Sequence, residues 1–170
     1  MQMPDGVRMN IDQRLFRETL GCFATGVTIV TSVTPEGELL GVTANSFNSV
    51  SLDPPLVLFS LHRGAYSLKA FESAGCFAIN VLRDSQKHLS NVFAKALADK
   101  WSGVEYEVWK TGAPILTQCL ANFECTTYAT HDGGDHVIFI GRVERMSRNA
   151  EGSPLLYYRG RYCSLAEAAQ

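Results

Sequence analysis

The sequence lacks the motifs that mark several common enzyme and nucleotide-binding classes. It contains no GxGxxG and no GxxxxGK[ST], so any phosphate-bearing cofactor would have to be held without a Rossmann or P-loop mechanism. It contains no GxSxG, and no cysteine has a nearby sequence partner of a known catalytic type. Acyl transfer and phosphoryl transfer therefore have no support in the sequence.

The chain also lacks an excess of one charge and any long apolar run. Its 15 basic and 17 acidic residues are interspersed and give a net charge of −2, whereas nucleic-acid binders usually carry a clustered basic face. No apolar run approaches the roughly 18 residues that suggest a membrane span. Residues 1–10 have no apolar core of the kind found in secretory signals. We therefore expect a cytoplasmic protein that binds neither nucleic acid nor membrane.

Cysteine is present but not in a disulfide or redox pattern. The five cysteines are odd in number, widely spaced and without a CxxC, and they are Cys22, Cys76, Cys119, Cys125 and Cys163. This pattern favours buried, reduced thiols. With 170 residues, 46% of them hydrophobic, the chain is expected to form a single domain over residues 1–170 that buries roughly 70% of its unfolded surface.

Short apolar segments alternate with turn residues along most of the chain. Runs rich in β-branched and aromatic residues predict strands over 27–33, 39–44, 56–61, 76–82, 119–130 and 137–146. The nearly continuous apolar run 56–61 is typical of a strand buried on both faces. Helices are expected after Asn10, over 65–73 and after Asp84, with a loop over 101–114. The frequency of strands, with helices between some of them, favours a barrel.

The first helix is expected to be amphipathic. Asn10 can cap it, with Gln13 three residues later as in a capping box. Its apolar face would consist of Ile11, Leu15, Phe16, Leu20 and Phe23.

The segment from Thr43 to Ser51 is the first candidate for chemistry. Six of its nine side chains can donate a hydrogen bond and none is charged. Such a strand end suits the carbonyls and nitrogens of an isoalloxazine ring, and small Ala44 would let a flat ring lie close to the backbone. The alternative is a polar connection whose hydroxyls satisfy its own backbone.

Two further segments could bind a ligand. Gly133-Gly134-Asp135-His136 could present a histidine to a substrate carbonyl or amide, or could simply be a hairpin tip. A metal site using His131, Asp132, Asp135 and His136 is disfavoured, because two of these ligands would sit in a glycine-rich turn. The segment 154–162 combines tyrosine and arginine, which can stack on a flat ring, but it could equally be a C-terminal tail docked on the barrel.

Several stretches, taken in order, resemble the flavin reductases that serve two-component flavin monooxygenases, including the reductase components of phenol and 4-hydroxyphenylacetate hydroxylases. Each stretch is weak alone, but the ordered set is specific and covers nearly the whole chain. The matching stretches are 16–18, 23–28, 41–47, 49–57, 77–82, 134–136, 139–143 and 154–158.

The resemblance implies a fold, an activity and partners. The fold would be mainly β with flanking helices, a split β-barrel of the FMN-binding type. The activity would be hydride transfer from NADH or NADPH to FMN or FAD, with reduced flavin supplied to a flavin-dependent oxygenase partner. The protein would be a homodimer with its flavin beside the dimer interface, and no metal is implied.

The resemblance also assigns site residues. His136 would lie near the nicotinamide as the catalytic and substrate-binding candidate, and Tyr158 is a second substrate-binding candidate. Arg63 and Lys69 are the nearest cations and could assist a flavin phosphate. The implied flavin-binding residues are Thr43, Ala44, Asn45, Ser46, Ser60, Leu61, His62, Ser67, Asn80 and Ser90.

Hydride transfer between two cofactors needs no protein acid or base, because the cofactors carry the chemistry and the protein positions the rings. We therefore expect His136 to orient the nicotinamide rather than to be indispensable. Two alternatives remain open on the sequence alone. One is an FMN-dependent oxidase of the same fold, and the other is a non-enzymatic flavin- or haem-binding redox module.

Overall fold

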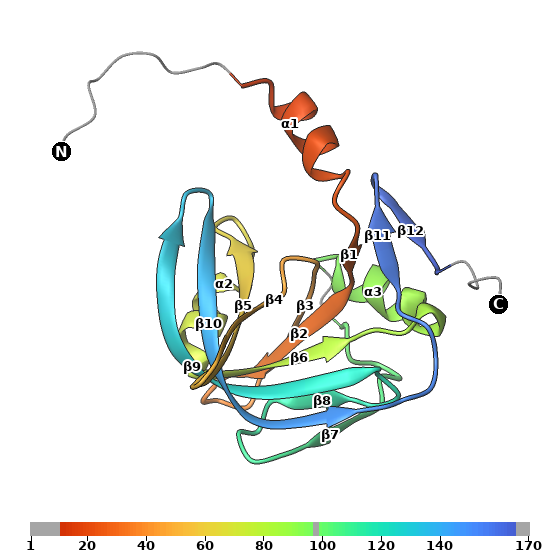
Figure 1. Cartoon of the computed structure of the whole chain (residues 1–170). Helices are drawn as coiled ribbons and strands as arrows, with labels where there is room; N and C mark the ends of the chain where they lie inside the picture. Colours follow the sequence, from red (N-terminus) through yellow and green to blue (C-terminus); the bar gives the residue numbers. More distant parts are fainter. Residues whose placement is uncertain (1–10, 97–98, 166–170) are drawn as a thin grey trace, which may run out of the picture.

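The computed structural model describes residues 11–96 and 99–165 and shows a mainly β fold with a few helices (Figure 1), which confirms the expected class. The helices are α1 (Gln13–Leu20), α2 (Leu68–Ala74), the 3-10 helix η1 (Asp84–Gln86) and α3 (Lys87–Phe93). The strands are β1 (Thr25–Gly26), β2 (Thr28–Val33), β3 (Leu39–Ala44), β4 (Asn48–Leu52), β5 (Pro55–His62), β6 (Cys76–Val81), β7 (Tyr106–Val108), β8 (Pro114–Leu116), β9 (Ala121–Gly133), β10 (His136–Arg148), β11 (Leu156–Tyr158) and β12 (Arg161–Cys163). None of the helices in the described ranges is long and apolar enough to cross a membrane.

Seven antiparallel strands form the main sheet, in the order β3-β2-β6-β9-β10-β5-β4. Strands β9 and β10 are each 13 residues long and form a hairpin that bends strongly (Figure 1). The bend coincides with register shifts between Ile140 and Gly141 and between Val143 and Arg145. An extra residue on one strand of a pair bends it and increases its twist. The hairpin therefore reaches from the middle of the sheet to a tip beside the end of β5, where His136 pairs with His62.

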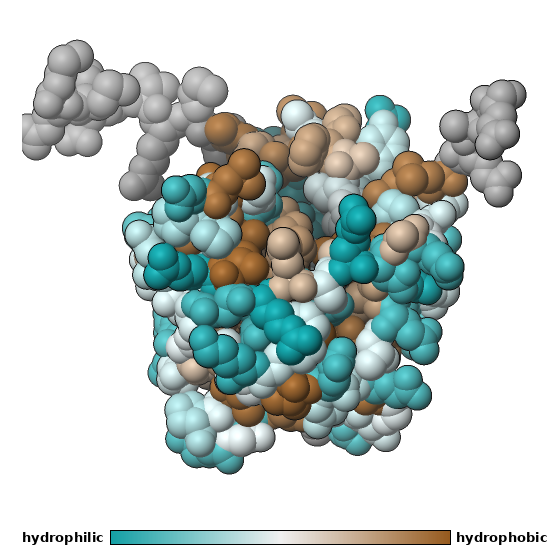
Figure 2. Space-filling view, turned by 60° about the horizontal axis from the view of Figure 1, so that its bottom comes forward, coloured by the Kyte–Doolittle hydropathy of each residue, from teal (hydrophilic) through white to brown (hydrophobic). Residues whose placement is uncertain are grey.

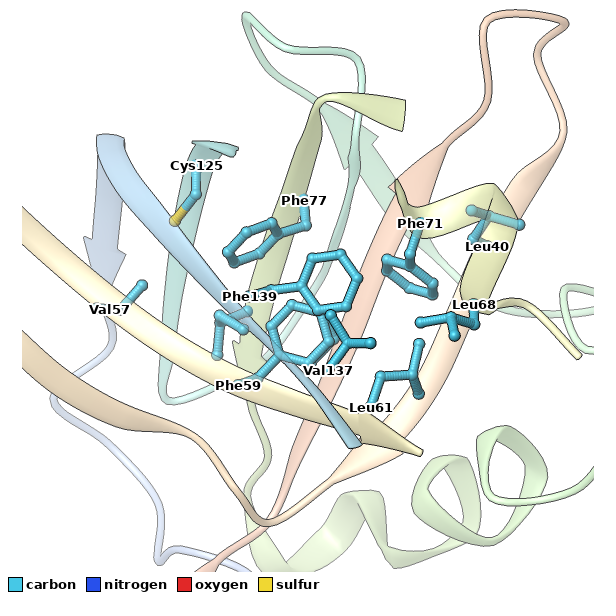
Figure 3. Close-up of a cluster of buried hydrophobic side chains, with 12 residues drawn as sticks. Leu40, Val57, Phe59, Leu61, Leu68, Phe71, Phe77, Cys125, Val137 and Phe139 are labelled. Atoms are coloured by element: carbon cyan, nitrogen blue, oxygen red, sulfur yellow. The ribbon is translucent and has the colours of Figure 1, made fainter. Parts of the chain in front are cut away.

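Aromatic rings fill the centre of the curved sheet. Phe59 of β5 stacks on Phe139 of β10 with ring centroids 4.9 Å apart, and Phe77 of β6 meets Phe59 edge-on at 5.0 Å. Figure 3 shows these rings converging, with Phe71 of α2 beside them. Buried aromatic side chains contribute much of a core's apolar area. This cluster therefore fixes β5, β6 and β10 relative to one another.

A glycine permits the close approach of β10 to that cluster. A Cβ atom added at Gly141 would lie 2.3 Å from the Phe77 ring and 2.8 Å from Cβ of Cys125. No side chain fits at these distances, so the strand can pass over Phe77 only because residue 141 is glycine.

Strand β5 is less buried than its apolar sequence predicts. Val57, Phe59 and Leu61 are buried, whereas Leu58 and Ser60 are half-buried and His62 is exposed. Side chains alternate between the faces of a strand. Ser60 and His62 therefore share the face opposite to the aromatic core.

The local structure differs from the sequence prediction in several places. Strands β1, β4, β7, β8, β11 and β12 were not predicted, and β7 lies within the expected loop 101–114. Asp84 begins η1 instead of capping a helix, because its neighbour Arg83 is the cap residue. Asn10 lies outside the described residues, and the cap of α1 is Asp12, whose carboxylate accepts from the backbone N–H of Arg14 and Leu15 at 2.8 and 2.9 Å.

Helix α1 leaves its apolar face uncovered within one chain. It contains no buried residue, and it projects away from the sheets (Figure 1). Leu15, Phe16 and Leu20 are 63%, 52% and 58% exposed. The helix predicted as amphipathic therefore has no partner for its apolar side within the described part of the chain.

Candidate functional site

Two strand edges meet without forming a ladder, and the candidate site lies between them. Strand β3 pairs only with β2, so its other edge is free of a strand partner in the described residues. The pairing of β5 with β4 stops at Leu58, which leaves the last residues of β5 paired only with β10. Ser46, just after β3, bridges the gap: its hydroxyl donates to the Ser60 carbonyl at 3.1 Å and accepts from the Ser60 N–H at 2.9 Å. We call this gap between β3 and β5 the seam.

A cavity of about 470 Å³ opens at the seam. Its walls come from the end of β3, the end of β5 and the tip of the β9–β10 hairpin. Eight of the predicted site residues line it, and they are Thr43, Ala44, Asn45, Ser46, Ser60, Leu61, His62 and His136. Gly133 and Ile138 complete the lining and were not predicted. Residues as far apart in sequence as Thr43 and Ile138 thus supply one wall, which carries no Asp, Glu, Lys or Arg side chain.

The hydroxyls on this wall are partly used by the fold. Thr43 Oγ1 donates to the Ser90 carbonyl at 2.7 Å, which ties β3 to α3. The Ser46 hydroxyl is engaged with Ser60, as described above. The Asn45 amide, in contrast, makes no hydrogen bond to the described part of the chain, and Asn45 is exposed. Within the described residues, the wall therefore offers one free amide, residual hydroxyl lone pairs and the unpaired edge of β3 to a ligand.

The hairpin tip is held by charged groups. Arg63 donates from Nε to the Gly134 carbonyl at 2.8 Å and pairs with the Asp132 carboxylate, and its backbone N–H donates to the Asp135 backbone carbonyl at 2.8 Å. The Arg63 hydrogen bond and charge lower the pKa of the Asp132 carboxyl. The guanidinium predicted to assist a phosphate is therefore already committed to the tip.

His136 and His62 face the cavity together. His136 Nδ1 lies 2.6 Å from Asp135 Oδ1, and this hydrogen bond lowers the pKa of the Asp135 carboxyl. His62 Nδ1 accepts from the Gly64 N–H at 2.9 Å. The two rings meet edge to face with centroids 5.2 Å apart. Because Asp132 and Asp135 are used by Arg63 and His136, the turn does not present a free carboxylate cluster to a metal.

A second cavity of about 640 Å³ adjoins the first through Thr43 and Leu61. Ser67 lines this second cavity, together with the cations Lys95 and Lys100. Lys100 Nζ donates to the carbonyls of Gly41 and Phe93 at 3.1 and 3.3 Å, and burial lowers its pKa. Lys69 lines a neighbouring hollow with Lys100. Sequence reasoning missed Lys95 and Lys100, because both follow α3 and nothing local links that segment to β3.

The structure keeps two of the predicted flavin-binding side chains away from the cavity. Asn80 is fully buried and its amide bonds inside the sheet, donating to Ile29 O and Thr31 Oγ1. Ser90 is also fully buried and contacts the cavity wall only through its carbonyl, while its hydroxyl lies 2.8 Å from the Tyr162 hydroxyl. Both sit beneath the wall and support it.

Tyr158 is not brought to the cavity either. It lies in the small sheet β1-β11-β12, where its ring carries the Arg159 guanidinium at 5.2 Å. The aromatic residues of 154–162 pack locally, as Tyr157 does on Tyr162 at 5.5 Å. The C-terminal segment is therefore docked as a sheet within one chain, which is the alternative that the sequence left open.

Comparison with known proteins gives one consistent assignment. Residues 20–166 match the flavin reductase like domain. A probable flavin reductase of Rhizobium meliloti is 45% identical over 151 residues, which are 89% of this chain and 48% of that protein. The reductase subunit HsaB of a flavin-dependent monooxygenase from Rhodococcus jostii is 42% identical over 91% of this chain and 79% of its own length. An FMN reductase (NADH), SmoA of Agrobacterium fabrum, is 44% identical over 89% of this chain and 85% of its length.

Solved structures agree with these relatives. The Streptomyces globisporus NADH:FAD oxidoreductase SgcE6, in complex with NAD and FAD fragments, superposes with a TM-score of 0.88 at 35% identity over 94% of this chain and 96% of that one. The chain spans about half the length of the Rhizobium relative but nearly the full length of SgcE6. The match over residues 20–166, and relatives above 40% identity, lead to one conclusion: the chain belongs to the flavin reductase-like family.

Proposed function

We propose that this protein is an NAD(P)H-dependent flavin reductase that transfers a hydride from NADH or NADPH to FMN or FAD and supplies reduced flavin to a partner monooxygenase. The observation that carries the proposal is the neutral, donor-rich cavity at the seam, in a chain of the flavin reductase-like family. Relatives that are reductase subunits of monooxygenases support the oxygenase partner.

The donor set of the seam fits a flavin. A bound flavin would accept the hydride that a nicotinamide gives up, so the chain need only bind and align two rings. The free amide of Asn45 and the unpaired edge of β3 would hold the polar edge of an isoalloxazine, with Ala44 beneath a flat ring. Ser67, Lys95 and Lys100 in the adjoining cavity would hold its phosphate, which accepts neutral and charged donors alike.

His136 would act from the hairpin tip, where it lines the cavity. Its Nδ1 is held by Asp135, so the ring has a fixed orientation toward the cavity. Binding of the nicotinamide, rather than proton transfer, is the role that this arrangement supports. Asn80, Ser90 and Tyr158 are not kept as direct contacts in the proposal, because their side chains do not reach the cavity.

The experiment is NADH oxidation, measured in stopped-flow absorbance with FMN and then with FAD. Loss of the NADH band only when flavin is present supports the reductase. Binding of flavin without any NADH oxidation would favour the redox module. Flavin-dependent oxidation of a small metabolite without NADH would favour the oxidase.

We further propose that the main sheet is a split β-barrel in a single domain spanning the chain. The bend of the β9–β10 hairpin and the Ser46–Ser60 bridge support this, because together they bring the end of β3 to the side of β5. The missing ladder at the seam is the split. The cavity exists because no ladder of hydrogen bonds closes the barrel between β3 and β5.

We also propose a homodimer in which a second copy covers the apolar face of α1. Leu15, Phe16 and Leu20 on the helix and Phe23 after it form a group of large exposed apolar side chains, of the kind that marks interaction surfaces. Figure 2 shows apolar groups gathered among hydrophilic ones on one face of the molecule. Light scattering should give about twice the chain mass of 18.7 kDa, and Leu15→Glu with Leu20→Glu should give a single chain mass. A wild-type monomer that binds flavin fully would contradict a shared interface site.

A cytoplasmic location is supported by the cysteines. All five are free thiols; Cys76, Cys119 and Cys125 are buried as expected, whereas Cys22 is exposed and Cys163 is half-buried. Burial raises the pKa of Cys119 to about 11 and that of Cys125 to about 12. Five thiols without a disulfide are typical of a reducing compartment.

A further inference from the structure

The hydrogen bonds of His62 define which of its ring nitrogens can meet a ligand. Its Nδ1 accepts from the Gly64 N–H, a group that can only donate. The proton of the neutral ring must therefore sit on Nε2. Gly64 keeps this contact close, because even a Cβ added there would lie 3.0 Å from the His62 ring. His62 thus presents an N–H donor to the cavity that it lines.

His136 has the opposite arrangement. Its Nδ1 lies 2.6 Å from an Asp135 carboxylate oxygen, which can only accept while ionised, and the lowered pKa of Asp135 keeps that carboxyl ionised. Nδ1 must then carry the proton, and Nε2 of the neutral ring is left as an acceptor. When its ring is neutral, His136 thus presents a lone pair to the same cavity.

The pairing of β5 with β10 places the two rings next to each other. His62 and His136 are directly paired across β5 and β10, and their ring centroids are 5.2 Å apart. The groups that face them are the Asp135 carboxylate, the Gly64 N–H and the Arg63–Asp132 pair at the tip, with no further charged side chain among the lining residues of the cavity. When both rings are neutral, one donor and one acceptor therefore lie next to each other at the mouth of the cavity.

We propose that His62 and His136 together recognise the carboxamide of the nicotinamide, with His62 Nε2–H donating to the carboxamide oxygen and His136 Nε2 accepting from its NH₂ group. The inference rests on the proposed reductase function and adds His62 as a second residue for NAD(P)H. A primary carboxamide is the part of the co-substrate that offers an acceptor and a donor on one carbon, which matches the pair. The imide edge of the flavin also offers both, so the test has to separate the two.

The test compares NADH with its reduced 3-acetylpyridine analogue, in which a methyl ketone replaces the carboxamide. The analogue keeps the carbonyl oxygen and lacks the NH₂ group. Its different intrinsic reactivity cancels when the ratio of kcat/KM for NADH to that for the analogue is compared between variants at saturating flavin. Wild type, His136→Ala, His62→Ala and His62→Gln would be measured, each with a flavin titration.

The proposal predicts different patterns for the two histidines. His136→Ala should lose roughly 10–100-fold in kcat/KM for NADH but less for the analogue, so the ratio should fall roughly 3–10-fold. His62→Ala should lose roughly 3–10-fold for both substrates, since both keep the carbonyl, and the ratio should stay within about twofold. His62→Gln retains an N–H donor and should recover part of the loss, which also covers the case that the alanine variant does not fold. Flavin affinity should stay within about twofold in all of them.

His131→Ala is the matched control, because His131 is an exposed histidine of the same hairpin outside the cavity lining. Its kcat/KM for NADH and its kcat/KM for the analogue should both match those of wild type. An unchanged kcat/KM ratio in His136→Ala overturns the proposal. Weaker flavin binding with normal NADH kinetics also overturns it, and that result would assign the histidines to the flavin. If wild type oxidises no NADH with either flavin, the proposed function itself fails, and this inference fails with it.

Discussion

Asn80 and Asn45 have the same side chain, but the fold uses every hydrogen-bonding group of the Asn80 amide and, within the described residues, none of the Asn45 amide. The Asn80 amide makes four hydrogen bonds: it donates to Ile29 O and Thr31 Oγ1, and it accepts from Leu116 N and Asn122 Nδ2 at 2.9 and 2.8 Å. An amide has two N–H donors and two oxygen lone pairs, so nothing is left for a ligand. The Asn45 amide, at the exposed end of β3, makes none within the described residues and lines the cavity.

The comparison shows that a polar residue in a strand is available to a ligand only where the fold has not already used its donors and acceptors. Between the two asparagines lie intermediate cases at the seam. The Ser46 hydroxyl both donates to and accepts from Ser60, and the Thr43 hydroxyl donates to Ser90. These four residues form a series, from fully used to free, that mutation can test.

The largest effect on stability is expected for Asn80→Ala. It removes the acceptor of two buried donors, the Leu116 N–H and the Asn122 amide. Each buried donor left unpaired costs about 1–3 kcal/mol, so the free energy of unfolding should fall by about 2–6 kcal/mol in urea titrations. Asn45→Ala, the matched control, should change it by less than about 0.5 kcal/mol. Equal losses in the two variants would show that the hydrogen bonds of Asn80 do not stabilise the fold more than the free amide of Asn45 does.

Ser46→Ala should come next and affect both stability and ligand binding. Its hydroxyl is the acceptor of the half-buried Ser60 N–H, and losing it should lower the free energy of unfolding by about 1–3 kcal/mol. Flavin affinity should fall as well, because the seam that shapes the cavity loosens. Ser46→Thr keeps the hydroxyl and should restore most of both. A stable variant with a normal dissociation constant would show that the Ser46–Ser60 bridge does not hold the seam.

Asn45→Ala should act on flavin alone. One neutral hydrogen bond is worth about 0.5–1.5 kcal/mol, which corresponds to a loss of about 2–12-fold in flavin affinity. Fluorescence titration with FMN and FAD measures this, and the kinetics of NADH at saturating flavin should be normal. An unchanged affinity would mean that the Asn45 amide is free because nothing binds there.

The smallest effect is expected for Thr43→Val. The Thr43 hydroxyl donates to the Ser90 carbonyl, which also accepts from the Ala94 N–H inside the helix end, so no buried group is left unpaired. The free energy of unfolding should fall by only about 0.5 kcal/mol, and flavin affinity should change by less than about twofold. A loss of affinity comparable with that of Asn45→Ala would place the remaining lone pair of Thr43 on the ligand.

Local patterns in the sequence were enough for much of the fold. The strand predicted over 39–44 is β3 with its observed bounds, and the helix predicted over 65–73 is α2, which Gly75 ends in the left-handed conformation. The polar strand β4 was missed, because it has no such pattern and forms by pairing with β5. The amphipathic pattern of α1 was correct, but the pattern alone could not say that its apolar face would find no cover within the chain.

The sequence by itself determined the family, the strand-rich class and the segments that form the cavity, because each of these is recorded in short stretches of neighbouring residues. Only the tertiary structure decided which polar side chains in those segments stay free. Asn80 lies in a matching stretch, yet its four partners come from β2, β8 and β9, which are distant in sequence. His62 and His136 are 74 positions apart, and their complementary donor and acceptor arise because β5 and β10 pair in one register. Hydrogen-bond partners are set by long-range packing, and for that reason the free groups of a site are a property of the fold and not of its motifs.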